Sequence, residues 1–90
     1  FQELVIKKEN NLITVDSAYR IEDLEKYFKI DLSSIRDEEI DSVGGLVYSK
    51  INRIPKNKEI IEIDKFLTIK IIKSNDRKIE TVEIRKIDNW

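Results

Sequence analysis

The N-terminal part of the chain contains short, β-branched apolar segments of the kind that form strands. Glu3–Lys8 and Leu12–Val15 are two such segments, and Glu9–Asn11 separates them. Asparagine tolerates the positive φ that a tight turn between strands requires. This part of the chain is therefore predicted to form a β-hairpin.

In the last third of the chain, apolar and polar residues alternate with the period of a strand. Glu59–Ile63 is a short strand candidate, and Leu67–Ile72 places its alternate apolar residues on one face. Ser74–Arg77 has the composition of a turn, and Lys78–Ile87 continues as a strand. One interval between apolar positions in that last strand is three residues instead of two. We therefore expect either a β-bulge near Glu80–Thr81 or a change of face there.

The middle of the chain changes to helical spacing. In Ile21–Phe28 the apolar residues recur every three or four positions, which predicts an amphipathic helix. The polar, acidic segment Asp31–Asp41 is predicted to be a loop held by two apolar anchors, Leu32 and Ile35.

A second helix is predicted to begin after Ser42, which is a good N-cap residue. One side of this helix is expected to carry Val43, Leu46, Val47, Lys50 and Ile54, with Ile51 at its edge. Pro55 is expected to stop the helix, because proline lacks the N–H that the next turn needs. The predicted order ββααβββ indicates a single α+β domain over residues 1–90, with two helices packed on a small, mostly antiparallel sheet.

Composition narrows the classes of function. The 90 residues carry a net charge of −1 with both signs interspersed, whereas nucleic-acid binding needs clustered positive charge, so no nucleic-acid partner is expected. No apolar run is long enough to span a bilayer, so this segment is not expected to insert into a membrane. The chain has no histidine and no cysteine, which weakens an enzyme hypothesis because the commonest general base and the thiol nucleophile are missing. Because the chain starts at Phe1, we expect a fragment of a longer protein.

The adjacent glycines Gly44 and Gly45 lie inside the second predicted helix, where each costs roughly 0.5–1 kcal/mol relative to alanine. With Ser42 they are a weak candidate for a cofactor or anion site, because a helix start without side chains exposes main-chain N–H groups. The preferred interpretation is packing. On a helical wheel Gly45 projects away from the core face and Gly44 lies on its flank, so Gly45 is the expected position of close approach.

An acidic group of residues is the best candidate for a hard-cation site, because Mg²⁺ prefers oxygen ligands. Its members are Asp31, Asp37, Glu38, Glu39 and Asp41. They lack the alternating spacing of a dedicated calcium loop, so the preferred interpretation is a solvated acidic loop. No catalytic residue, metal or cofactor is expected.

A set of residues at the second predicted helix, in the segment after it and in the last turn and strand forms a spaced pattern. Its members are Asp41, Ser42, Val43, Gly44, Gly45, Leu46, Val47, Ile54, Pro55, Arg77, Ile79 and Val82. This pattern resembles the CorC/HlyC transporter-associated domain, the small C-terminal module of CorC-type magnesium/cobalt efflux proteins and hemolysin-C-like proteins. The resemblance covers about Leu12 to Ile84. The chain departs from the family pattern at Asn52–Arg53, at Ser17–Arg20, which leaves the first helix poorly capped, and at Lys65–Phe66.

The resemblance implies a non-catalytic regulatory domain that modulates divalent-cation efflux, with CBS domains and a membrane domain of the parent protein as partners. It implies a cytoplasmic location, with the parent protein at the cytoplasmic face of the membrane, and it leaves a homodimer open. The family fold is similar to a subdomain of PCMH-type FAD-binding proteins, so a module that binds an adenine or flavin nucleotide is the alternative.

Overall fold

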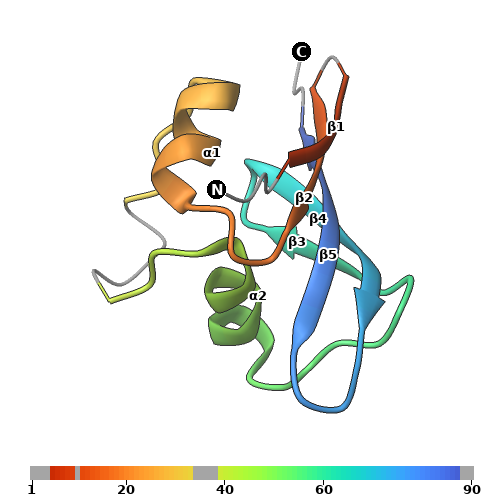
Figure 1. Ribbon diagram of the computed structural model, residues 1–90. Helices are drawn as coiled ribbons and strands as arrows, with labels where there is room; N and C mark the ends of the chain where they lie inside the picture. Colours follow the sequence, from red (N-terminus) through yellow and green to blue (C-terminus); the bar gives the residue numbers. More distant parts are fainter. Residues whose placement is uncertain (1–4, 10, 34–38, 88–90) are drawn as a thin grey trace.

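The computed structural model describes residues 5–9, 11–33 and 39–87 (Figure 1). Its helices and strands follow the predicted order ββααβββ. They are β1 (Val5–Glu9), β2 (Leu12–Asp16), α1 (Ile21–Phe28), α2 (Val43–Ile51), β3 (Ile60–Ile63), β4 (Leu67–Ser74) and β5 (Ile79–Lys86).

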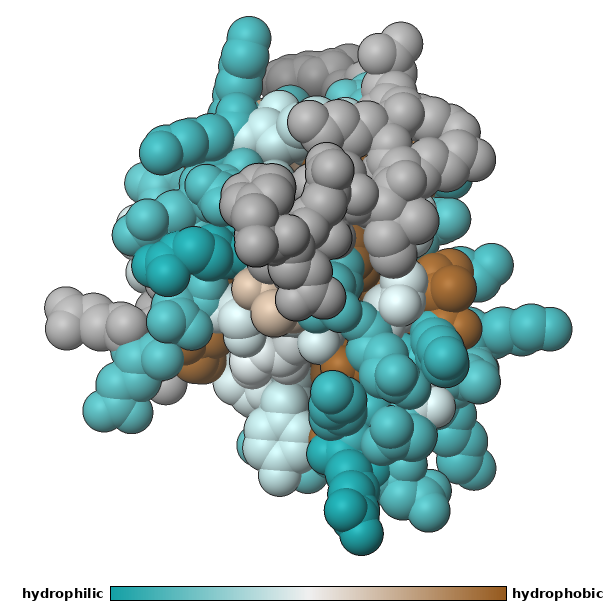
Figure 2. All heavy atoms as spheres, viewed as in Figure 1, coloured by the Kyte–Doolittle hydropathy of each residue, from teal (hydrophilic) through white to brown (hydrophobic). Residues whose placement is uncertain are grey.

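The strands form one five-stranded sheet in the order β1-β2-β5-β4-β3, and every pair of neighbours is antiparallel. Both helices lie on one side of this sheet (Figure 1), which confirms the predicted α+β architecture. The space between the helices and the sheet is filled by buried aliphatic side chains from both layers, including Ile13, Leu24, Val47, Ile69 and Ile84. The face that Figure 2 presents is mostly hydrophilic, with small separate apolar areas.

The irregular interval in the last strand is a β-bulge, which was the first of the two predicted alternatives. The pairing of β4 with β5 gains one residue on β4 at Ile72 and one residue on β5 at Glu80. Ile79 and Val82 consequently both face the core, although three positions separate them. The carbonyl of Glu80 accepts a hydrogen bond of 2.9 Å from the N–H of Ser17, so the bulge also anchors the turn that follows β2.

Helix α1 begins without a side-chain cap, as the departure from the family pattern implied. Arg20 occupies the N-cap position and makes no capping hydrogen bond. At the other end, Lys29 has a left-handed conformation with φ of 58°. The following loop is held by Leu32, which is fully buried and whose N–H donates to Glu25 Oε2 at 2.7 Å. Leu32 is therefore the anchor that was predicted, whereas Ile35 lies outside the described residues.

Helix α2 is capped by Ser42, as predicted, but its C-terminus differs from the prediction. Asn52 adopts the left-handed conformation with φ of 57° and ends the helix. This C-cap lies three residues before Pro55, which was the predicted stop. Asparagine tolerates this conformation because its side chain is short and polar. The predicted helix side is also shorter than expected, because Ile54 lies beyond the helix and is only partly buried; Lys50, predicted on the same side, is exposed.

Candidate functional site

The first turn of α2 is joined to the turn that follows β2 by main-chain hydrogen bonds. The N–H of Val43 donates to the carbonyl of Tyr19 at 3.0 Å, and the N–H of Gly44 donates to the carbonyl of Ser17 at 2.9 Å. The N–H of Gly45 donates to Ser42 Oγ at 3.2 Å. These donors are therefore engaged within the chain, which supports the packing interpretation of the glycine pair. Ligand binding by Ser42, Gly44 and Gly45 stays a prediction.

The two glycines have the opposite roles from those predicted. A Cβ atom at Gly44 would lie 3.0 Å from Ser17 Cβ and 3.3 Å from the Ser17 carbonyl oxygen. A Cβ atom at Gly45 would meet Ser42 Oγ at 3.2 Å and a methyl group of Ile40 at 3.5 Å. Gly44 is thus the position of close backbone approach, and the assignment of that role to Gly45 is wrong. A helical wheel gives the direction of a residue but not which distant segment packs there.

A shallow groove of about 340 Å³ runs between the start of α2, the turn after β2 and the β4–β5 hairpin. We call it the glycine groove. Its lining residues are Ser17, Ala18, Ser42, Gly44, Gly45, Tyr48, Ile54, Arg77, Lys78 and Ile79. Several of them carry the motifs singled out from the sequence, so the fold brings motif residues from distant parts of the chain to one surface.

The charged residues that line the glycine groove are both basic. Arg77 and Lys78 reach it from the β4–β5 turn, and both are exposed. Asn75 fixes this turn, because its Oδ1 accepts hydrogen bonds from the N–H of Arg77 at 2.8 Å and of Lys78 at 3.0 Å. Tyr48 adds an aromatic side chain that is 50% exposed. The groove thus offers two cations and one aromatic ring on a chain whose net charge is −1.

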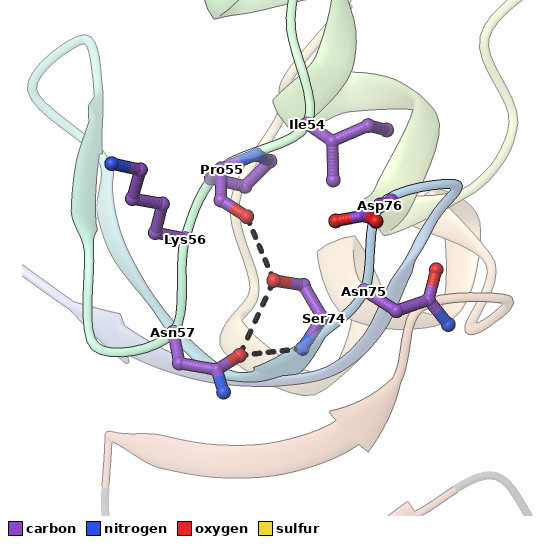
Figure 3. A pocket seen from close by; sticks show the side chains of 7 residues that line it. All are labelled: Ile54, Pro55, Lys56, Asn57, Ser74, Asn75 and Asp76. Atoms are coloured by element: carbon purple, nitrogen blue, oxygen red, sulfur yellow. Dashed lines mark hydrogen bonds between the residues drawn. The ribbon is translucent and has the colours of Figure 1, made fainter.

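Beside the glycine groove lies a second hollow of about 650 Å³, which we call the hairpin pocket (Figure 3). It is lined by Ile54, Pro55, Lys56, Asn57, Ser74, Asn75 and Asp76. Ser74 Oγ donates to the Pro55 carbonyl at 2.7 Å, and the N–H of Ser74 donates to Asn57 Oδ1 at 2.7 Å. These bonds fix the end of β4 against the segment that follows α2. Ile54 borders both hollows.

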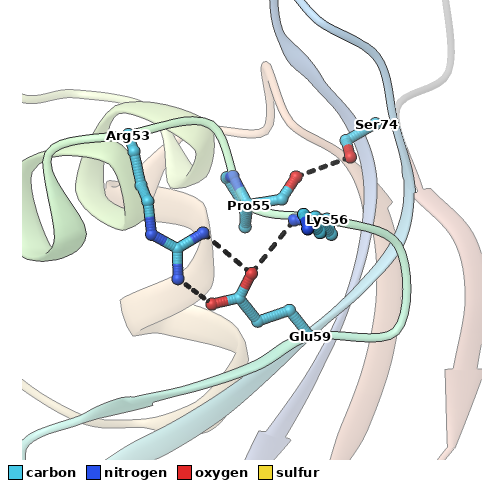
Figure 4. A network of polar contacts seen from close by, with 5 residues as sticks. All are labelled: Arg53, Pro55, Lys56, Glu59 and Ser74. Atoms are coloured by element: carbon cyan, nitrogen blue, oxygen red, sulfur yellow. Dashed lines mark hydrogen bonds and ion pairs between the residues drawn. The ribbon is translucent and has the colours of Figure 1, made fainter.

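An ion pair stabilises the same segment (Figure 4). Both terminal nitrogens of the Arg53 guanidinium donate to the Glu59 carboxylate, and the N–H of Lys56 donates to Glu59 Oε1 at 3.0 Å. The pKa of Glu59 is lowered mainly by the hydrogen bond from the Arg53 side chain and secondly by the hydrogen bond from the Lys56 N–H. The hydrogen bond between Arg53 and Glu59 also raises the pKa of Arg53. The pair links the two ends of the loop between α2 and β3, and Pro55, Lys56 and Asn57 of this loop line the hairpin pocket.

The acidic residues proposed as a weak cation site are only partly within the described residues. Asp31, Glu39 and Asp41 are exposed, and the carbonyl of Asp41 accepts the N–H of Ile21 at 2.9 Å. Asp37 and Glu38 lie outside the described residues. Within residues 5–9, 11–33 and 39–87, no group of three or more His, Cys, Asp or Glu side chains is arranged to hold a metal ion. The metal-site hypothesis for Asp37, Glu38, Glu39 and Asp41 stays a prediction.

Sequence reasoning did not identify Tyr48, Lys78 or the hairpin pocket. The exposure of Tyr48 could have been found, because its position on α2 lies off the apolar face. The hairpin pocket could not have been found from the sequence. Asn57 lies in a loop and Ser74 at the end of a strand, and the two residues meet only because β3 pairs with β4. The described part of the chain holds no helix whose length and apolar character suffice to cross a bilayer.

Comparison with known proteins identifies the family to which the chain belongs. Residues 6–88 match the family model described as "Transporter associated domain", CorC_HlyC. Hemolysin C of Brachyspira hyodysenteriae is 31% identical over 85 residues, which cover 94% of this chain and 31% of that protein. The chain thus spans less than a third of the length of this relative.

Two solved structures show the same fold. One is the Mg²⁺ and Co²⁺ transporter (CorC) associated region from Neisseria meningitidis, at 21% identity and a TM-score of 0.79, with 94% of this chain and 100% of that chain covered. The other is the transporter associated domain of a CBS domain protein from Porphyromonas gingivalis, at 12% identity and a TM-score of 0.74, with 96% and 100% covered.

Proposed function

Because this chain belongs to the CorC_HlyC transporter associated domain family, we propose that it is a non-catalytic regulatory domain that modulates divalent-cation efflux. The match over residues 6–88 is the observation that carries the proposal. In this proposal the chain is one domain of a longer host protein of the CorC/hemolysin-C type. Magnesium and cobalt are the proposed cargo, because the Neisseria meningitidis relative is described as associated with a Mg²⁺ and Co²⁺ transporter.

The proposed partners are the CBS domains and the membrane domain of the host protein, with this domain on the cytoplasmic side. The Porphyromonas gingivalis structure, which comes from a CBS domain protein, supports the first partner. A domain of this kind regulates only if its contacts differ between two states of the host. Its removal should therefore shift the response to cations without abolishing the fold of the rest of the protein.

We assign the regulatory contact to the glycine groove. Five of its ten lining residues are small, namely Ser17, Ala18, Ser42, Gly44 and Gly45, so another segment can approach this part of the surface closely. Arg77 and Lys78 border it and form no ion pair with any residue in the described ranges, so an acidic segment of another domain would find both cations available. Opposite charges across such a contact favour correct docking more than raw affinity.

The first experiment deletes residues 12–87 from the full-length host protein and follows growth in raised Mg²⁺ and Co²⁺. We expect altered tolerance at an unchanged level of host protein in the membrane. A well-expressed deletion with parental tolerance and parental transport would contradict the regulatory role. Turnover of a substrate by the isolated domain would contradict its non-catalytic character.

A further inference from the structure

Strand β3 is an edge of the sheet and exposes an apolar side chain. It pairs with β4 on one side, and no described strand lies on its other side. Ile60 on this edge is 62% exposed, the largest exposure among the described large apolar residues. An open strand edge with an exposed aliphatic side chain is a template for pairing with another chain, and a lysine at such a position is a common protection against it.

The register with β4 identifies the main-chain groups that are unpaired on this edge. The N–H of Ile71 donates to the carbonyl of Glu59 at 2.8 Å, so these opposed residues form a hydrogen-bonded pair. Hydrogen-bonded and non-hydrogen-bonded pairs alternate along an antiparallel ladder. Ile61 therefore bonds to β4, whereas Ile60 and Glu62 direct their N–H and C=O groups away from it, toward the open edge.

We propose that β3 pairs in antiparallel fashion with β3 of a second copy of this chain, about a two-fold axis at Ile61. In this register Ile60 lies opposite Glu62 of the second copy, and each exchanges both of its outward hydrogen bonds with the other. The exposed Ile60 side chain then lies beside the Glu62 side chain of the second copy, on the same face of the joined sheet. The contact is isologous, as closed two-fold dimers require.

Alternative registers satisfy fewer groups. A shift by one residue would oppose outward groups of one strand to inward groups of the other. A two-fold axis at Ile60 would oppose Glu62 to Lys58 of the second copy, but the N–H of Lys58 already donates to the Ile71 carbonyl at 2.6 Å. A two-fold axis at Glu62 would place the two Glu62 side chains directly opposite each other, and like charges disfavour that pairing. The axis at Ile61 therefore pairs the outward groups of both Ile60 and Glu62 without opposing like charges.

Charge favours the antiparallel direction. Lys58 precedes β3 and Asp64 follows it, and both are exposed. Antiparallel pairing brings each Lys58 near Asp64 of the second copy, whereas parallel pairing would bring like charges together. Three further charges lie close by. Glu59 is already bound by Arg53, Glu62 lies opposite Ile60 of the second copy, and Lys65 follows Asp64.

The dimer should be weak. Strand β3 has four residues, so the contact is small, and interfaces below about 1,200 Å² of total buried surface belong to the weak and transient class. Sedimentation velocity of the 90-residue chain over about two decades of concentration should show a rapid monomer–dimer equilibrium. A single monomeric species at every concentration would contradict the proposal.

Two glutamate variants separate edge pairing from association through the sheet face. Ile60→Glu places a carboxylate directly opposite Glu62 of the second copy, so like charges face each other twice across the two-fold axis and the dimer should be lost. Ile72→Glu is the matched control, because Ile72 is 41% exposed but lies on the interior strand β4, and it should dimerise as the parent does. Equal loss in both variants would contradict edge pairing. Both side chains are exposed, so thermal melts should confirm that each variant is folded.

Amide hydrogen exchange gives a second, residue-specific test. The amides of Ile60 and Glu62 should become protected as the concentration of the chain rises, whereas the amide of Ile61 should be protected at all concentrations. A dimer in which the amides of Ile60 and Glu62 exchange as in the monomer would contradict the assigned register. The inference does not depend on the proposed function, because the isolated chain can dimerise whether or not it regulates cation efflux.

Discussion

A single methyl group at Gly44 should destabilise the domain more than the same group at Gly45. The Cβ atom of Gly44→Ala would lie 3.0 Å from Ser17 Cβ and 3.3 Å from the Ser17 carbonyl oxygen. Ser17 cannot withdraw easily, because its N–H is bonded to Glu80 at 2.9 Å and its carbonyl to Gly44 at 2.9 Å. Overpacking of this kind costs about 1–3 kcal/mol.

The helix offsets part of this cost. Replacing glycine by alanine inside a helix gains up to about 1 kcal/mol. With an overpacking cost near the middle of that range and the full helix gain subtracted, we expect a net loss of about 1 kcal/mol in the free energy of unfolding for Gly44→Ala. In Gly45→Ala the closest contact of the new Cβ atom is the Ser42 hydroxyl at 3.2 Å, and this hydroxyl can rotate away. Its rotation would weaken the N-cap by about 1 kcal/mol. The gain in helix propensity is of similar size, so the free energy of unfolding should stay near that of the parent.

Urea denaturation of the parent and both variants measures these differences. We expect the midpoint of Gly44→Ala to fall clearly and that of Gly45→Ala to stay near the parent, with equal m-values. A Gly44→Ala variant as stable as the parent would refute the close approach of α2 to Ser17. A larger loss in Gly45→Ala than in Gly44→Ala would restore the original assignment from the helical wheel.

Three further changes test local features of the fold. Lys29→Gly should raise the free energy of unfolding by about 1 kcal/mol in chemical denaturation, because φ is 58° there, and Lys26→Gly within α1 should lower it. Ser42→Ala should cost about 1 kcal/mol through the lost cap of α2, measured in the same way, and an unchanged midpoint would contradict the capping role. Burial, followed by Asp23, raises the pKa of Tyr19, so the neutral phenol is favoured in the folded state. Its contribution to stability is complete below about pH 10 and is lost as the pH rises through the folded pKa, so melts of Tyr19→Phe should decline less with alkaline pH than those of the parent.

The elements that were predicted correctly have strong local signals. The apolar period identified α1 and α2, and the interval of three residues in β5 located a bulge at Glu80. These features depend on residues that are near one another in the sequence, so their pattern can be read directly. The end of α2 at Asn52 has a local signal as well, because asparagine tolerates the left-handed conformation. Pro55 is the stronger helix breaker, so the end of the helix was predicted there instead.

The other errors concern contacts between distant segments. Gly44 is constrained by Ser17, which belongs to another turn, and no periodicity within α2 reveals that neighbour. The glycine groove likewise forms only when the sheet brings Arg77 to the start of α2. The sequence therefore indicated which residues are unusual, while the fold determined which of them meet.

The central claim is that this domain regulates cation efflux through contacts at the glycine groove. The most direct test measures cation efflux from vesicles that contain the full-length host protein, as a function of Mg²⁺ concentration. Three proteins are compared: the parent, the double variant Arg77→Glu/Lys78→Glu, and the control variant Lys65→Glu. We predict that the double variant shifts the concentration of half-maximal efflux while its maximal rate and the control curve stay parental. Superimposable curves for all three proteins would contradict the claim.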